Sequence, residues 1–122
     1  MIPLYDYSGA PVAYADDLCL AVYLPDGTLA AWFDNGLLYT PQGRYLGWVD
    51  NGWVLDRTGH PALFADNASG RPLRPPVQAP SAALWPRPVR RAVRPPAKAA
   101  RPARRGRKPD WSALSGPGYF QQ

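Results

Sequence analysis

Four aspartates recur at equivalent positions, each seven residues after a recurrent glycine. They are Asp16, Asp34, Asp50 and Asp66. A ring of carboxylates could bind a hard cation such as calcium, which takes several oxygen ligands. Two of these aspartates, however, begin an Asp-Asn-Gly sequence, which is typical of tight turns by itself. We therefore interpret all four as turn residues and expect no metal site.

The other residue types that could support catalysis are isolated in the sequence. His60 has no carboxylate or nucleophile at a recognisable motif spacing, and Cys19, the one cysteine, has no basic activator nearby. The sequence contains no zinc-binding, phosphate-loop, dinucleotide-binding or serine-hydrolase signature. A lone cysteine excludes an intrachain disulfide and suits a reducing compartment. We expect a protein that is not an enzyme and that has no catalytic residues and no cofactor.

Aromatic residues also recur, five positions after each glycine, as Tyr14, Trp32, Trp48 and Phe64. They could line a pocket for a cation or a nucleobase. The favoured interpretation is a shared core, because aromatic side chains contribute large buried areas. Trp48 and Trp53, which flank an Asp-Asn-Gly, are the candidate aromatic surface. Phe33 and Val49 make the other face apolar in places, so another subunit could cover it.

These residues belong to four repeats of 16 to 18 residues, aligned on the glycines at positions 9, 27, 43 and 59. An aliphatic residue stands five positions before each glycine, and Gly or Pro interrupts every window long enough for a helix. Each repeat therefore predicts a β-hairpin, with the aromatic residue and the residue two before it on one face, as in Val12 and Tyr14. We predict an all-β, pseudo-fourfold, flower-like domain over residues 1–70. Closing the ring would remove its exposed strand edges.

The repeats resemble the bacterial four-fold beta flower family. The similar stretches are IPLYDYSGAPVAYADD, AVYLPDGTLAAWFDNG, LLYTPQGRYLGWVDNG and WVLDRTGHPALFAD. The resemblance implies the fold and implies no active site. It extends to a basic Pro-rich tail and to an ending such as DWSALSGPGYF. Two departures are Leu55, where the other repeats have Tyr, and the longer spacing around residues 17–20. GWVDNGW is also similar to choline-binding repeats, but the shorter period argues against them.

Charge divides the chain in two. Residues 1–70 hold two Arg and eight Asp, a net charge of 2 − 8 = −6, whereas residues 71–122 hold twelve Arg or Lys and one Asp, a net charge of 12 − 1 = +11. Residues 71–109 are rich in Pro, Arg and Ala, so we predict a largely disordered basic tail that binds nucleic acid or another polyanion. An acidic membrane surface, an acidic protein and the acidic domain itself are alternative partners. The candidate polyanion-binding residues are Arg87, Arg90, Arg91, Arg94, Lys98, Arg101, Arg104, Arg105, Arg107 and Lys108.

Aromatic residues return in the terminal segment, residues 110–122. We predict a docking motif formed by Trp111, Leu114, Tyr119 and Phe120, with Asp110 capping one helical turn. The motif could dock on the β domain or on a partner, and an unstructured terminus is the alternative.

The sequence as a whole predicts a non-enzymatic binding module attached electrostatically by its basic tail. The alternative is a protein–protein adaptor or assembly subunit that uses the β domain and the aromatic segment as interaction surfaces. No leader peptide and no membrane span are expected, so we predict a cytoplasmic protein.

Overall fold

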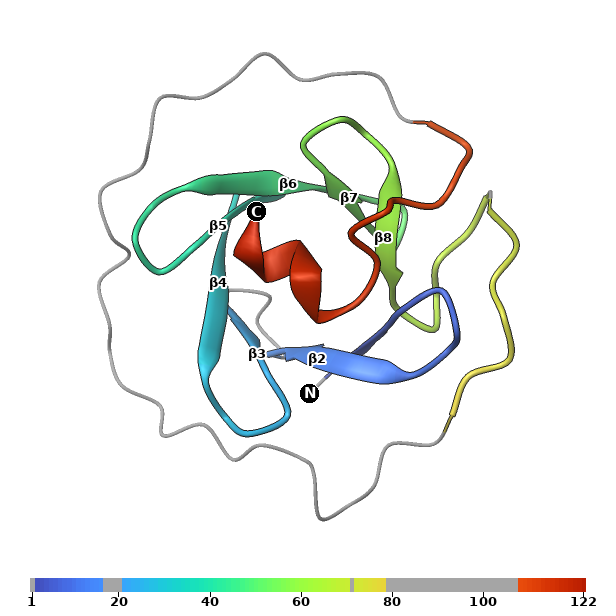
Figure 1. Ribbon diagram of the computed structural model, residues 1–122, viewed down its shortest axis with the longest axis horizontal. Coiled ribbons are helices and arrows are strands. Elements are labelled where there is room, and N and C mark those ends of the chain that lie inside the picture. The colour runs from blue at the N-terminus through green and yellow to red at the C-terminus, as the bar shows by residue number, and fades with distance from the viewer. Residues whose placement is uncertain (1, 17–20, 71, 79–107) are drawn as a thin grey trace.

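The sheet is a closed barrel of eight antiparallel strands in chain order, and the last strand pairs with the first. The computed structural model describes residues 2–16, 21–70, 72–78 and 108–122. The strands are β1 (Ile2–Tyr5), β2 (Pro11–Ala15), β3 (Ala21–Tyr23), β4 (Leu29–Asp34), β5 (Leu37–Tyr39), β6 (Tyr45–Asp50), β7 (Trp53–Asp56) and β8 (Pro61–Phe64). Figure 1 shows them as four hairpins around a central axis. The predicted all-β, fourfold architecture is confirmed.

The same turn ends each hairpin, because the recurrent glycine provides a backbone conformation that other residues rarely adopt. The φ angles of these glycines range from 83° to 95°. In each turn the glycine N–H donates to the carbonyl oxygen three residues earlier, at 2.8–3.1 Å. A positive φ carries no steric cost for glycine, so the glycine spacing determines where the four hairpins reverse.

Asn-Gly pairs form the links between neighbouring hairpins. Asn35 and Asn51 have φ angles of 50° and 48°, and the glycines that follow have 78° and 84°. Two successive positive φ angles define the type I′ turn, which matches the twist of antiparallel strands. The turn interpretation of Asp-Asn-Gly is therefore confirmed at both places.

A β-bulge recurs in all four hairpins and reverses one expected arrangement. The register shifts at the same step of each hairpin, for example between Leu38 and Tyr39. A bulge inserts one residue and breaks the two-residue alternation of side chains. Leu46 therefore lies in the core cluster inside the barrel, whereas Trp48 lies in a second cluster. The prediction that these two positions share a face was wrong.

The barrel wall separates two clusters of buried side chains. The interior cluster contains the aliphatic column Leu4, Val22, Leu38 and Val54 together with Tyr119. The outer cluster contains Trp48, Trp53, Leu55 and Phe64, with Trp111 packed against it. Because successive strand residues point to opposite faces, these aromatic side chains lie on the outside of the wall, where other parts of the chain cover them.

Two segments beyond β8 also lie on the barrel. The Gln78 N–H donates to the carbonyl of Gly9 at 2.9 Å, and the Lys108 N–H donates to the carbonyl of Gly59 at 2.8 Å. Both glycines lie in hairpin turns, so residues 78 and 108 are attached to the tips of the first and fourth hairpins. Residues 79–107, most of the predicted tail, lie outside the described residues. In the part of the chain that the structure describes, no helix has the length and apolar character needed to cross a bilayer.

Candidate functional site: a barrel interior with one closed end

Residues 108–122, the C-terminal segment, close one end of the barrel. The segment ends in a short 3₁₀ helix, η2 (Pro117–Gln121), which Figure 1 shows at the centre of the ring. Tyr119 is fully buried, and its hydroxyl donates to the carbonyl of Leu55 at 2.8 Å. The side-chain amide of Gln122 donates to the carbonyl of Leu46 at 3.0 Å. Burial raises the pKa of Tyr119 well above its ordinary value, so its hydroxyl stays protonated and remains a donor.

A polar cluster centred on the buried Asp56 joins the C-terminal segment to the fourth hairpin. The Ser112 hydroxyl donates to the Asp56 carboxylate at 2.5 Å, and the Thr58 hydroxyl donates to its other oxygen at 2.6 Å. The backbone N–H groups of Thr58 and His60 donate to the carboxylate as well. Burial acts to raise the pKa of Asp56, but these hydrogen bonds together hold it below its ordinary value of 3.8. Asp56 is therefore a charged anchor for the segment.

Ser115 extends these contacts to the first hairpin. Its hydroxyl accepts a hydrogen bond from the Tyr7 N–H at 2.9 Å and donates to the carbonyl of Ala62 at 2.8 Å. The C-terminal segment thus bonds to the first, third and fourth hairpins. It holds together parts of the ring that are distant in sequence.

Trp111 covers the outer cluster rather than the interior. Its ring lies edge-on to Trp53, with centroids 5.5 Å apart, and edge-on to Phe64 at 6.0 Å. The Trp53 indole N–H donates to the carbonyl of Ser69 at 2.7 Å. Trp53 and Trp48 are 0% and 4% exposed, so the expected aromatic surface at these residues was wrong. Both are members of the buried outer cluster, against which Trp111 packs.

The residues predicted to dock divide into two groups. Trp111, Tyr119 and Phe120 pack on the barrel, whereas Leu114 remains 38% exposed. The helical turn expected from Asp110 is not formed there, and the short helix begins at Pro117 instead. Proline suits the first position of a helix because its φ is already fixed and it lacks the N–H that would go unpaired.

Gly47 is a site residue that the sequence analysis missed. A Cβ at this position would lie 1.8 Å from the Leu55 carbonyl oxygen and 2.7 Å from the Tyr119 hydroxyl. The equivalent positions in the other repeats hold Ala13, Ala31 and Leu63. The departure from the repeat was the signal that could have revealed it. Leu55, another departure from the repeat, is fully buried in the outer cluster, against which Trp111 packs.

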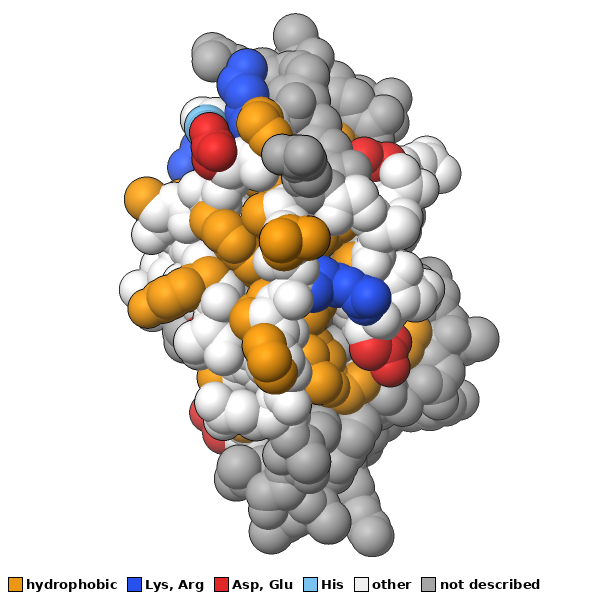
Figure 2. Space-filling view, turned by 90° about the vertical axis from the view of Figure 1, so that its right-hand side faces the viewer, with side chains coloured by type: hydrophobic (Ala, Val, Ile, Leu, Met, Phe, Trp, Pro, Cys, Tyr) orange, Lys and Arg blue, Asp and Glu red, His pale blue; other side chains and the backbone are white. Residues whose placement is uncertain are grey.

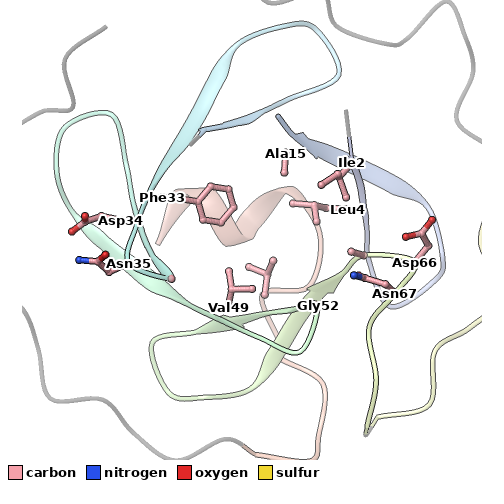
Figure 3. Close-up of a pocket in the computed structure, with 13 residues that line it drawn as sticks. Ile2, Leu4, Ala15, Phe33, Asp34, Asn35, Val49, Gly52, Asp66 and Asn67 are labelled. Atoms are coloured by element: carbon pink, nitrogen blue, oxygen red, sulfur yellow. The ribbon is translucent and has the colours of Figure 1, made fainter. Parts of the chain in front are cut away.

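The opposite end of the barrel holds an apolar cavity of about 770 Å³. Its wall residues include Ile2, Leu4, Ala15, Phe33, Val49, Val54 and Ala65. Figure 3 shows the side chains of Phe33, Leu4, Ile2 and Val49 directed toward the axis. Asp34, Asn35, Asp66 and Asn67 also border the cavity but lie farther from the axis, at its rim. The aromatic column of the repeats does not contribute to this lining.

The other candidate residues lie elsewhere. The nine basic residues from Arg87 to Arg107 and Cys19 are outside the described residues, while Lys108 is exposed beside the fourth hairpin tip. His60 lies in that turn, with its Nδ1 2.7 Å from the Thr58 hydroxyl oxygen. Among residues 2–16, 21–70, 72–78 and 108–122, no group of three or more His, Cys, Asp or Glu side chains is arranged to hold a metal ion.

These features define a class of protein: an eight-stranded barrel of four similar hairpins whose interior is filled from one end by a segment far along the chain. The family model for the 4-fold beta flower protein matches residues 2–120, so this chain belongs to the 4-fold beta flower family. The match includes Trp111 and Tyr119, so the segment that closes the barrel falls within it. Comparison with curated proteins and with solved structures gave no significant match.

Proposed function

We propose that this protein is a non-enzymatic binding module whose barrel holds both ends of a basic segment, residues 79–107, that attaches to nucleic acid or another polyanion. The observation that carries the proposal is the pair of backbone hydrogen bonds from Gln78 to Gly9 and from Lys108 to Gly59. They tie both flanks of the segment to hairpin tips. A segment tied at both ends loses less conformational freedom on binding than a free tail of the same length.

The charge distribution supports the same function. Residues 79–107 contain nine Arg or Lys and no acidic residue, whereas residues 1–70 have a net charge of 2 − 8 = −6. A polyanion is attracted to the segment and repelled by the barrel. Binding would be largely independent of base sequence, because Arg and Lys contacts to phosphates carry no sequence information.

Fluorescence anisotropy of the full-length protein with a labelled DNA duplex tests this proposal. If about eight charges contact phosphates, the affinity falls with a log–log salt slope of about −7. Changing Arg104, Arg105 and Arg107 to Gln should reduce that slope by about 3. The matched control changes Arg44 and Arg57 of the barrel to Gln and should leave it unaltered. Lack of binding at low salt would reject the proposal.

A second candidate function, a protein–protein adaptor, is favoured by an exposed apolar surface on residues 72–78. Leu73 is 89% exposed and Val77 is 46% exposed. Figure 2 shows hydrophobic side chains gathered on the side of the molecule where this segment lies. A surface of this kind is typical of an interaction site. Light scattering should show that the wild-type protein self-associates. Leu73→Ser and Val77→Ser should weaken this self-association. A strictly monomeric wild-type protein would count against self-assembly.

A further inference from the structure

We propose that the cavity at the end of the barrel opposite η2 is a binding site for a small amphiphile that has an aliphatic body and a cationic group. The site is distinct from the basic segment, and the proposal does not depend on polyanion binding. It rests on the volume of the cavity, the side chains of its wall and the charges of its rim.

The size of the cavity suits a small molecule. Its volume of about 770 Å³ falls within the roughly 300–1,000 Å³ range of ligand pockets. It lies along the axis of a closed sheet, and the mouths of β-barrels are frequent ligand sites. The wall is built from β-strands and from type I′ turns at Asn35 and Asn51, which are rigid elements.

The wall determines which part of a ligand can enter. The side chains directed into the cavity are aliphatic, apart from Phe33. The buried polar residues of the described chain are Thr40, Asp56 and Ser112, and none of them lines it. A polar group placed deep in the cavity would lose its hydrogen bonds to water without replacement. The inserted part of the ligand is therefore apolar.

The rim determines the charge of the group that stays near the surface. Asp34 and Asp66 border the cavity, and the nearest described cation is Arg74, which donates to the carbonyl of Asp66. Residues 1–70 as a whole have a net charge of 2 − 8 = −6. The local field therefore favours a cation and disfavours a carboxylate such as that of a fatty acid. The same charges argue against a second copy of the barrel at this end, because the two acidic rims would face each other.

Calorimetric titration of the full-length protein with three probes of equal chain length tests the proposal. The probes are octylammonium, octanol and octanoate, each used below the concentration at which it forms aggregates. Octylammonium should bind most tightly, octanol less tightly and octanoate least. Replacing Asp66 by Asn should reduce the preference for octylammonium over octanol by about threefold and leave octanol binding unchanged.

Two cavity-filling variants locate the binding. Ala65→Leu and Val49→Phe add volume to the wall, and each should weaken octylammonium binding by about tenfold or more, the equivalent of roughly 1.4 kcal/mol. Val49 is only partly buried, so Val49→Phe still folds and serves as the test if Ala65→Leu does not. Leu114→Ala, on the exposed part of the C-terminal segment, is the matched control and should bind like the wild type.

Three outcomes would overturn the inference. If no probe binds, the cavity is not a site for an amphiphile of this kind. If the filling variants bind as well as the wild type, the probes bind elsewhere. If octanoate binds as tightly as octylammonium, the rim does not select a cation. None of these results bears on DNA binding by the basic segment, so the two proposals fail separately.

Discussion

The interior of the barrel is packed differently at its two ends. At one end the C-terminal segment fills the interior with Tyr119 and is attached to the fourth hairpin through the hydrogen bond from Ser112 to Asp56. At the other end, Asn-Gly turns and aliphatic side chains line a cavity that is open to solvent. The four repeats are similar to one another, and the segment that fills one end of the barrel lies outside them. The difference between the two ends therefore comes from this segment. A repeat can specify a ring, and a non-repeated element then gives its two ends separate roles.

Removing the side chain that fills the closed end should have the largest effect on the free energy of unfolding and would remove the difference between the two ends. Tyr119→Ala leaves a void in the interior cluster and should lower the free energy of unfolding by about 3–5 kcal/mol. Tyr119→Phe loses only the hydrogen bond to Leu55 and should cost about 1 kcal/mol. Urea denaturation measures both. Leu114→Ala, on the same segment but exposed, should change stability by less than about 0.5 kcal/mol.

A methyl group at position 47 should also displace the C-terminal segment from the closed end of the barrel. Gly47→Ala places its Cβ against the Leu55 carbonyl and the Tyr119 hydroxyl, and we expect a loss of about 2–3 kcal/mol from overpacking. Gly118→Ala is the control, because a Cβ there meets no atom within 4 Å. Thermal unfolding of the two variants decides the matter. Equal melting temperatures would show that Gly47 is not constrained by its neighbours.

The third change removes the charged anchor of the C-terminal segment. Asp56→Asn weakens the hydrogen bonds from Ser112 and Thr58 and should cost about 1–3 kcal/mol at neutral pH. Because the folded-state pKa of Asp56 is lowered, its contribution is present above the unfolded-state value and is lost as the pH falls through the folded-state value. The gap between wild type and variant, measured by urea denaturation, should therefore narrow below about pH 4. A constant gap would contradict this role.

The smallest effect on the free energy of unfolding is expected at the open end, the end of the barrel that holds the cavity. Phe33 is only partly buried and borders an existing cavity, so Phe33→Ala should cost about 1 kcal/mol, well below the cost of Tyr119→Ala. Side-by-side urea titrations of these two variants test the contrast directly. Similar losses at both ends would mean that the open end contributes to the core as fully as the closed end.

The spacing of particular residues predicted the ring correctly. The glycines of the turns and the Asn-Gly links require positive φ angles, so they determine where the chain reverses whatever it packs against. The aliphatic column Leu4, Val22, Leu38 and Val54 then provides one buried face. These signals are local, and four copies of them reinforce each other.

The arrangement of the site was less predictable, because it depends on contacts between distant residues. The bulges reverse the side-chain alternation at Leu46 and Trp48, and no residue type marks them. Trp53, Gly47 and Leu55 break the repeat, and each of them contacts or neighbours a segment more than fifty residues later, which the repeat pattern does not reveal. The cavity results from the diameter of the closed ring, which strand patterns alone do not determine.

The hydrogen bond between Tyr119 and Leu55 joins residues 64 positions apart. During synthesis the four hairpins therefore leave the ribosome before the residue that completes their interior has been made. Local turns let the hairpins form early, whereas the contact that fills the ring must wait. The interior of the ring can therefore be filled only after residue 119 has been made, so the contact that completes the core is among the last to form.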